Sequence, residues 1–237
     1  MRWLVTAGGT QVEIDAVRAI GNVGTGRTGA AIAVEARRHG HDVVLLTSNP
    51  EAADLSVAIR SYRTFDELHR QMSELIHGGG FDCLVHSAAV SDFRPANVYA
   101  PMAGTTFETA SSSWRGDPPR LIDRAATKVR SDETELWLRL VRTPKLIDLV
   151  RSEWGFRGVI VKFKLEVGVE PGALRTLAEA SRRQSVADLM VANTLEGARD
   201  WALVGPIGVE YRRVARGQLA AELVTAVEHR FAERGHG

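Results

Sequence analysis

The chain has 237 residues, of which 44% are hydrophobic and 25% are charged, and its formal net charge is +1. These values are typical of a globular protein with enough material for one large or two small domains. The near-neutral charge gives no reason to expect nucleic acid or a membrane as partner, and no apolar run reaches the length of a membrane span. One cysteine, Cys83, excludes an internal disulfide framework, so we expect a cytoplasmic protein.

Strand and helix patterns alternate over the first third of the chain. The strand patterns cover residues 2–7, 41–47, 81–86 and the weaker segment 57–62, and the helical patterns cover 26–39 and 65–76. A polar loop is expected to lead through residue 25. Alternation of this kind predicts right-handed crossovers. The fold class is therefore α/β: a Rossmann-like, mostly parallel sheet with helices on both faces.

Regular patterns stop at residue 87 and return at residue 135. Four prolines and a run of three serines predict an irregular stretch over 87–123, with a short strand at 105–109. We expect a flexible flap over about 94–133 within a single domain, 1–237.

The C-terminal part returns to alternating strands and helices. Its elements are strands at 135–141, 159–163 and 187–192, an edge hairpin strand at 208–214, and helices at 143–154, 171–184 and 219–231. Thr143 and Pro144 read as the N-cap and first residue of their helix. The charged residues 233–237 read as a frayed tail.

A glycine-rich stretch from Arg18 to Gly29 opens the first helix and contains the spelling G-x-G-x-x-G at Gly24, Gly26 and Gly29. Glycine lets a phosphate approach the backbone, and a helix N-terminus offers unpaired N–H groups to it. A loop that only turns the chain into a helix would look the same.

A dehydrogenase is disfavoured by the position of this spelling. A dinucleotide fingerprint follows the first strand directly, whereas this one begins 17 residues after Ala7, and no acid ends the second strand. No Walker motif, no Tyr/Lys pair four residues apart and no Cys/His zinc pattern occurs. His86, inside a strand, reads as a core histidine.

Two glycine turns instead suit a mononucleotide or a phosphorylated substrate. They are Gly8–Thr10 and Gly24–Gly29, and both are expected at the C-terminal edge of the sheet, where ligands of open α/β folds bind. Residues 88–92 reach the same edge. Asp92 there could contact a metal or a ligand hydroxyl, or cap a turn.

Strings across nearly the whole chain resemble the phosphopantothenate–cysteine ligases of coenzyme A biosynthesis. The matching strings are Val5–Thr10, Asp15–Arg18, Ile20–Asn22, Thr25–Gly29, Ser87–Pro95, Lys128–Arg130, Val141–Lys145, Phe163–Glu166 and Asp188–Asn193. In many bacteria this ligase is fused behind a flavin-dependent decarboxylase. The chain resembles a stand-alone member, for which no flavin is expected.

The resemblance implies an enzyme that joins 4′-phosphopantothenate and cysteine through an acyl-nucleotidyl intermediate. It implies CTP or ATP as co-substrate, Mg²⁺, release of pyrophosphate and a homodimer. No nucleic acid or membrane partner is expected, and no metal ligand is identified among the residues.

Site residues follow from the resemblance alone. Nucleotide-binding residues would be Gly8, Gly26, Gly29, Phe163 and Asn193; residues that meet the pantothenate part would be Asn22, Ala88, Ala89 and Asp92. Arg18 and Asn22 would act on the intermediate, and Lys128 on the flap would cover the reactive phosphate.

Several positions depart from the family pattern. The flap string is Lys128-Val129-Arg130-Ser131, with one lysine; Gly24-Thr25 stands where Ser-Ser is usual, and Thr194 where Asp is common. These departures would fit a non-catalytic nucleotide-binding paralogue, which stays open as one alternative. The other alternative is an NAD(P)-dependent oxidoreductase, which the missing acid and the missing Tyr/Lys pair disfavour.

Overall fold

The computed structural model describes residues 1–52, 54, 56–125 and 128–235. The chain forms two compact units. The first contains Met1–Thr10, Val23–Val90 and Lys145–Gly237, and the second contains Gln11–Asn22 and Ser91–Pro144. The chain passes between the units four times, so each unit is assembled from segments that are distant in sequence. A single ligase domain over 1–237 remains a prediction.

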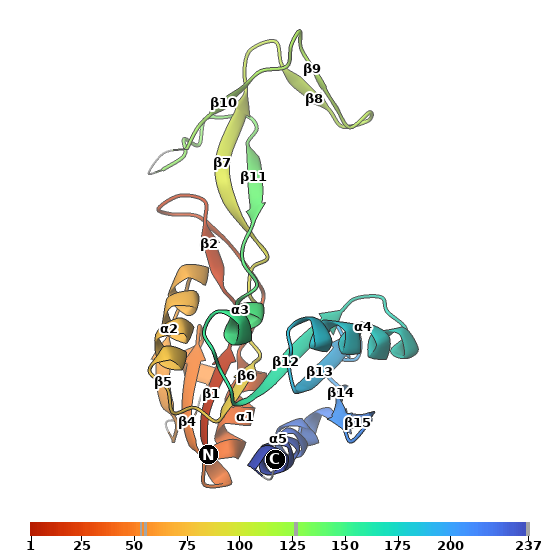
Figure 1. Cartoon of the computed structure of the whole chain (residues 1–237). Coiled ribbons are helices and arrows are strands. Elements are labelled where there is room, and N and C mark those ends of the chain that lie inside the picture. The colour runs from red at the N-terminus through yellow and green to blue at the C-terminus, as the bar shows by residue number, and fades with distance from the viewer. Residues whose placement is uncertain (53, 55, 126–127, 236–237) are drawn as a thin grey trace. The chain divides into compact units, whose positions relative to one another are not determined.

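An eight-stranded sheet forms the centre of the first unit (Figure 1). In spatial order its strands are β15 (Glu210–Ala215), β14 (Trp201–Ile207), β13 (Leu189–Thr194), β12 (Val159–Glu166), β6 (Cys83–His86), β1 (Arg2–Ala7), β4 (Asp42–Thr47) and β5 (Ala58–Ser61). All neighbours pair in parallel except β13 with β14 and β14 with β15. The predicted fold class and the predicted edge hairpin are confirmed.

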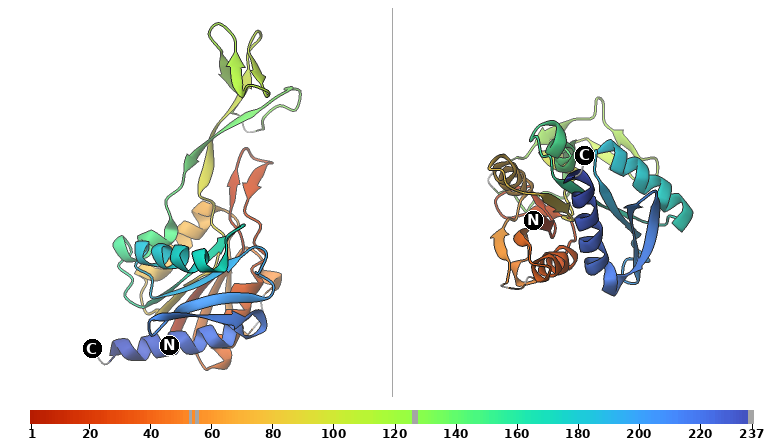
Figure 2. Two further views of the ribbon diagram at one scale, coloured as in Figure 1. Left: turned by 90° about the vertical axis from the view of Figure 1, so that its right-hand side faces the viewer. Right: turned by 60° about the horizontal axis from the view of Figure 1, so that its bottom comes forward.

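Helices cover both faces of this sheet. They are α1 (Arg27–Arg38), α2 (Phe65–His77), α3 (Leu146–Ser152), α4 (Pro171–Gln184) and α5 (Leu219–Gly235), with 3₁₀ turns at η1 (Pro50–Ala52) and η2 (Arg216–Gln218). Helices α1 and α5 pack together on one face, and α2, α3 and α4 lie on the other (Figure 2).

The two faces follow from the alternation of side chains along each strand. On β13, Val191 belongs to the core under α1 and α5, whereas Met190 and Ala192 pack against Leu174 and Ala178 of α4. All five side chains are buried. A central strand therefore needs apolar residues at every position, which is why its sequence reads as a continuous buried run.

Local sequence determines the N-cap of one helix but not that of another. Thr64 caps α2 through local chemistry, because its hydroxyl accepts from the Glu67 N–H in a capping box. Helix α3 begins at Leu146 with Lys145 as its N-cap, so the prediction of Thr143 as the cap is wrong. Thr143 instead donates its hydroxyl to the Ser91 carbonyl at 2.5 Å.

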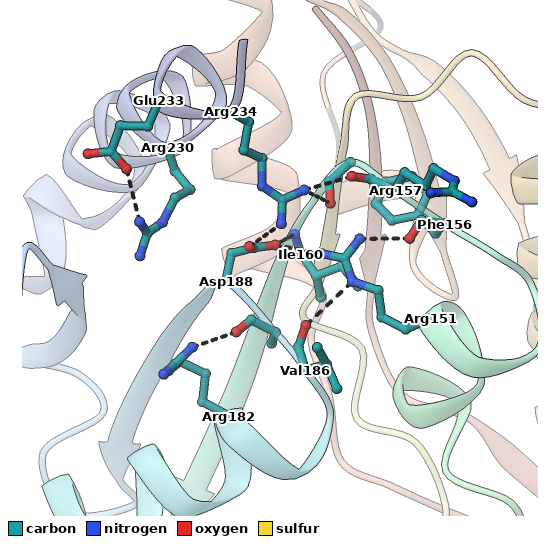
Figure 3. Close-up of polar contacts among 12 residues, drawn as sticks. Arg151, Phe156, Arg157, Ile160, Arg182, Val186, Asp188, Arg230, Glu233 and Arg234 are labelled. Atoms are coloured by element: carbon teal, nitrogen blue, oxygen red, sulfur yellow. Dashed lines mark hydrogen bonds and ion pairs between the residues drawn. The ribbon is translucent and has the colours of Figure 1, made fainter. Parts of the chain in front are cut away.

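Asp188, just before β13, ties three elements of the first unit together (Figure 3). Its carboxylate accepts from the Arg151 guanidinium at 2.7 Å, from the Ile160 N–H at 2.7 Å and from Arg234. Arg234 also donates to the carbonyls of Arg157 (2.6 Å) and Gly158 (2.9 Å). Helix α5 consequently continues to Gly235, so the predicted frayed tail is wrong for residues 233–235; residues 236–237 lie outside the described chain.

The second unit consists of short antiparallel strands. They are β2 (Gln11–Glu13), β3 (Ala19–Gly21), β7 (Phe93–Pro101), β8 (Thr106–Glu108), β9 (Ser113–Arg115), β10 (Leu121–Asp123) and β11 (Trp137–Arg142). Strands β10, β7 and β11 form one sheet, and β2–β3 and β8–β9 form hairpins. The predicted short strand at 105–109 is confirmed by β8. The predicted polar loop through residue 25 is wrong where β2 and β3 form, and the predicted irregular stretch over 87–123 is wrong where β7, β9 and β10 form.

Aromatic contacts explain part of this order. The rings of Phe107, Trp114 and Trp137 lie within 4.6–5.2 Å of one another by centroid distance. Phe107 and Trp114 are directly opposite in the β8–β9 hairpin, where such pairs stabilise short strands. The expected flap over about 94–133 overlaps these strands, and its residues 126–127 lie outside the described chain.

Within the described ranges, no helix combines the length and the apolar character that crossing a membrane requires.

His86 is a core histidine, as the sequence predicts. It is buried on β6, and its Nδ1 lies 2.9 Å from the Thr6 hydroxyl. Burial, reinforced by the Lys162 ammonium, lowers its pKa to about 4. Lys162, opposite His86 in the sheet, is itself buried, and burial lowers its pKa to about 8. Its ammonium donates to the Ser181 carbonyl at 2.9 Å and to the Ser185 hydroxyl at 2.5 Å.

We expect His86 to make the fold acid-sensitive. Its folded pKa lies below the value of about 6.5 for the unfolded chain, so the unfolded state binds more protons between pH 6.5 and 4. The free energy of unfolding should fall by up to about 1.4 kcal/mol per pH unit across this window. Urea unfolding at pH 7, 6 and 5 measures the slope. His86→Gln should flatten it and the exposed His77→Gln should not; equal slopes in all three proteins would contradict the assignment.

Candidate functional site

A cavity of about 300 Å³ lies in the first unit at the C-terminal ends of β1, β6, β12 and β13, beside the start of α1. Its lining residues are Gly8, Gly24, Thr25, Gly26, Thr28, Gly29, Ser87, Ala88, Ala89, Phe163, Lys164, Leu165, Asn193, Ala198 and Arg216. Seven of the residues predicted from the sequence are among them: Gly8, Gly26, Gly29, Ala88, Ala89, Phe163 and Asn193. Their individual roles remain predictions.

The two glycine turns meet at Gly24 and Gly8. A Cβ on Gly24 would lie 2.8 Å from the carbonyl carbon of Gly8 and 2.9 Å from the Gly9 nitrogen. Both of these neighbours are backbone atoms, which cannot rotate away as a side chain can. The departure from the family pattern at position 24 therefore has a structural reason in this chain, because a serine would collide with the first turn.

Helix α1 starts at the second glycine turn with free backbone donors. Its N-cap, Gly26, has a φ of 74° and no capping side chain, and no acidic residue occupies the first turn. The unpaired N–H groups and the positive end of the helix dipole are therefore available to an anion. Gly29 lets the helix approach the sheet, since a Cβ there would lie 2.6 Å from both the Ala7 Cβ and the Ser87 hydroxyl oxygen.

Hydrogen bonds join the first turn to the end of β6. The Ala89 N–H donates to the Gly8 carbonyl at 2.8 Å, and the Thr10 N–H donates to the Ala89 carbonyl at 3.0 Å. The Ser87 hydroxyl donates to the Thr6 carbonyl at 2.7 Å. These bonds fix the wall of the cavity, and the small side chains of Ala88 and Ala89 leave it open.

The remaining wall comes from β12, β13 and η2. It includes the ring of Phe163, the amide of Asn193 and two cationic side chains, Lys164 and Arg216. Lys164 is paired with Glu166 at 2.7 Å. Thr194, which replaces the family's common Asp, is buried, and its hydroxyl accepts from the Gly197 N–H at 3.1 Å. That position thus serves the local turn.

Five lining residues were not predicted as site residues from the sequence: Ser87, Lys164, Leu165, Ala198 and Arg216. Arg216 is one of 26 arginines, 30 basic residues less four lysines, and no motif marks it. It lies 188 residues from its partner Thr28. The signal that brings it to the cavity is the tertiary fold alone.

The other predicted site residues belong to the second unit, where Asp15 and Arg18 form a clamp on Val129. The Asp15 carboxylate, whose side chain is 0% exposed, accepts from Arg18 Nη2 at 2.7 Å and from the Val129 N–H at 3.0 Å. It also accepts the N–H groups of Val17 and Arg18, at 2.9 and 2.8 Å. The Arg18 guanidinium, followed by the Val17 N–H, holds the Asp15 pKa well below its usual range.

Arg18 completes the clamp by donating to the Val129 carbonyl at 2.7 Å. Both polar groups of the buried Val129 backbone are thereby held, and Lys128 is the preceding residue. The contacts of Arg18 support a role in positioning the segment that carries Lys128. Its predicted action on an intermediate stays a prediction.

Asn22, Asp92 and Lys128 also lie in the second unit and are exposed. The Asn22 side-chain oxygen accepts from the Ser91 hydroxyl at 3.0 Å, and the Asp92 carbonyl accepts from the Thr143 N–H at 3.0 Å. The first contact fixes the orientation of the Asn22 amide. The predicted roles of all three residues remain predictions.

The described residues contain no group of three or more His, Cys, Asp or Glu side chains that could hold a metal ion. The lining of the cavity includes no carboxylate. Mg²⁺ in nucleotide enzymes is usually held by one or two carboxylates together with substrate phosphates. The cavity therefore supplies no such ligand.

Comparison with known proteins identifies the family. Residues 1–102 match the family model described as DNA/pantothenate metabolism flavoprotein C-terminal domain. The coenzyme A biosynthesis bifunctional protein CoaBC of Thermococcus kodakarensis is 30% identical over 233 residues, which are 96% of this chain and 51% of that protein. The chain belongs to the phosphopantothenate–cysteine ligase family. The resemblance predicted from the sequence is confirmed.

Solved structures agree with this assignment. The DNA/pantothenate metabolism flavoprotein from Streptococcus pneumoniae is 28% identical with a TM-score of 0.76, and the match covers 97% of this chain and 99% of that one. A Cab2 variant in complex with phosphopantothenate-cysteine shares the fold at 16% identity and a TM-score of 0.71, covering 100% of this chain and 89% of that one. The chain spans about half the length of the curated relatives it matches.

The contact between the glycine turns can be tested by adding a side chain at Gly24. Gly24→Ser should lower the free energy of unfolding by about 1 to 3 kcal/mol, because the new Cβ overlaps the Gly8 backbone. Thermal unfolding should show the loss as a lower melting temperature. The control is Gly172→Ser, where no atom lies within 4 Å of an added Cβ. A Gly24→Ser protein as stable as the control would contradict the contact.

A second prediction concerns the clamp on Val129. Asp15→Asn removes the negative charge of the carboxylate that accepts hydrogen bonds from the Arg18 guanidinium and the Val129 N–H. The segment around Lys128 should therefore detach from Asp15 and unfold locally more often. Limited trypsin digestion should cut after Lys128 and Arg130 roughly tenfold faster than in the wild type. Asp132→Asn, which removes an exposed partner of Arg130 in the same segment, is the matched control. Equal rates for Asp15→Asn and wild type would refute the clamp.

Proposed function

We propose that the chain joins 4′-phosphopantothenate to cysteine, at the expense of CTP or ATP, in coenzyme A biosynthesis. The observation that carries the proposal is the cavity, because seven residues predicted from the resemblance line it together with the free N-terminus of α1. Membership of the family supports the same activity. As the chain spans about half of its curated relatives, the reaction of this chain has to be tested directly.

The reaction has two steps whose atoms balance. A carboxylate oxygen of 4′-phosphopantothenate attacks the α-phosphorus of the nucleotide, and pyrophosphate leaves. The cysteine amine then attacks the acyl carbon of the mixed anhydride; it loses a proton as the amide forms, and the nucleoside monophosphate leaves. The first step concentrates negative charge on phosphate oxygens, which fixed N–H donors stabilise.

The residues of the cavity suit the nucleotide. The N–H groups at the start of α1 are donors for phosphate oxygens, and the Gly8 backbone lines the same cavity. Phe163 offers a ring face, and Asn193 offers an amide that can both donate and accept. We assign to Asn22 the contact with the acyl group, to Arg18 the positioning of the Lys128 segment, and to Lys128 the cover of the reactive phosphate.

The homodimer, the magnesium requirement and the cytoplasmic location belong to the proposal as well. Each follows from the resemblance or from the composition. Mg²⁺ would enter with the nucleotide triphosphate, since the cavity lining lacks carboxylates. Gel filtration and metal chelation address the first two directly.

The test is pyrophosphate release by the purified chain. The chain is incubated with 4′-phosphopantothenate, cysteine, Mg²⁺ and either CTP or ATP, and we expect release with at least one nucleotide. Asn22→Ala should stop turnover or let the acyl-nucleotide accumulate. Asn97→Ala, which removes a half-buried amide in the same unit, should leave turnover unchanged. No release with either nucleotide would sink the ligase proposal and favour a non-catalytic paralogue.

A further inference from the structure

Arg216 reaches the nucleotide cavity from the far end of the chain. It is the first residue of η2, directly after β15, and its main-chain N–H donates to the Asp200 carbonyl at 2.8 Å. Its guanidinium donates to the Thr28 hydroxyl, in the first turn of α1. The side chain is thus fixed at both ends beside the positive end of that helix.

The charge around Arg216 is unbalanced. In the described part of the chain no carboxylate forms an ion pair with it, and its side-chain hydrogen bond goes to a neutral hydroxyl. Lys164, the other cation of the cavity, already has Glu166 as partner. Partial burial lowers the pKa of Arg216. A guanidinium that is removed from water beside a helix N-terminus is unfavourable unless an anion completes the site.

A second cavity is also lined by Arg216. It has a volume of about 260 Å³ and shares Thr28 and Arg216 with the first. Its lining adds the guanidinium of Arg27 and the start of α5, with no carboxylate. The shared Arg216 therefore stands where a chain of phosphates, entering along the glycine turns, would extend past the N-terminus of α1.

We propose that Arg216 binds the terminal phosphates of the nucleotide and the pyrophosphate that they become. This inference rests on the proposed function for the identity of the ligand, and on the two cavities for its position. Arginine has five N–H donors in a planar fork, so one bond to Thr28 leaves others for phosphate oxygens. Arg27, an exposed residue in the lining of the second cavity, adds a further positive charge.

The experiment measures binding of inorganic tripolyphosphate and pyrophosphate by titration calorimetry, in the absence of Mg²⁺, 4′-phosphopantothenate and cysteine. Arg216→Gln should weaken the binding of tripolyphosphate by about tenfold or more, and Arg216→Lys by roughly threefold, because lysine keeps the charge and loses the fork. Arg212→Gln, at an exposed arginine on β15 that lines neither cavity, is the matched control and should bind like the wild type.

The outcomes separate this inference from the ligase proposal. If the chain binds tripolyphosphate through Arg216 yet releases no pyrophosphate in the ligase assay, the result supports the inference about Arg216 and contradicts the ligase proposal. In an active enzyme, Arg216→Gln should also raise the KM for the nucleotide and weaken inhibition by pyrophosphate. Wild-type affinity for tripolyphosphate in a folded Arg216→Gln protein would overturn the inference. Should that variant not fold, wild-type affinity in Arg216→Lys would overturn it equally.

Discussion

The first unit depends on the approach of one backbone to another, where Gly24 meets Gly8. The space between the two backbones has no room for a Cβ on residue 24. The second glycine turn can therefore pack against the end of β1 only because residue 24 is a glycine. Once the turn is in place, α1 starts beside the carboxyl ends of the central strands with its N–H groups unpaired. The same contact therefore sets the packing of the helix and leaves its N-terminus available to an anion.

Charge is distributed around this contact in a way that favours a phosphate ligand. The cavity is lined by two cationic side chains and by no carboxylate, and one of the cations, Lys164, is internally paired. At the opposite end of the strands, two arginines share Asp188 and tie α3 and α5 to the sheet. The arginines at that end stabilise the fold through Asp188, whereas Arg216 has no carboxylate partner among the residues that the structure describes. The difference lies in their partners, since the residue type is the same.

The second unit uses a buried carboxylate for a different purpose. Asp15 accepts five hydrogen bonds from three residues, and Arg18 returns one to Val129, so a segment distant in sequence is held at its backbone. Charge-assisted bonds of this kind fix geometry more firmly than neutral ones. Arg18 can thus contribute to a reaction by holding the backbone next to Lys128. This gives Arg18 a physical role that a motif alone cannot separate from direct contact with substrate.

The sequence by itself determined the alternation of buried strands and amphipathic helices, the parallel sheet, the edge hairpin and the family, because periodicity and linear strings are local properties. It also indicated seven residues of the cavity. The sequence also indicated β8 and β11 of the second unit. Only the tertiary structure decided the other short strands of that unit and the contacts that order them, such as Phe107 with Trp137 across 30 residues. Thr143 likewise does not cap a helix, because its hydroxyl donates to the carbonyl of Ser91, which is distant in sequence. The position of Arg216 at the cavity is also decided by tertiary structure. Its partner Thr28 is 188 residues away, and local sequence patterns carry no information about such contacts.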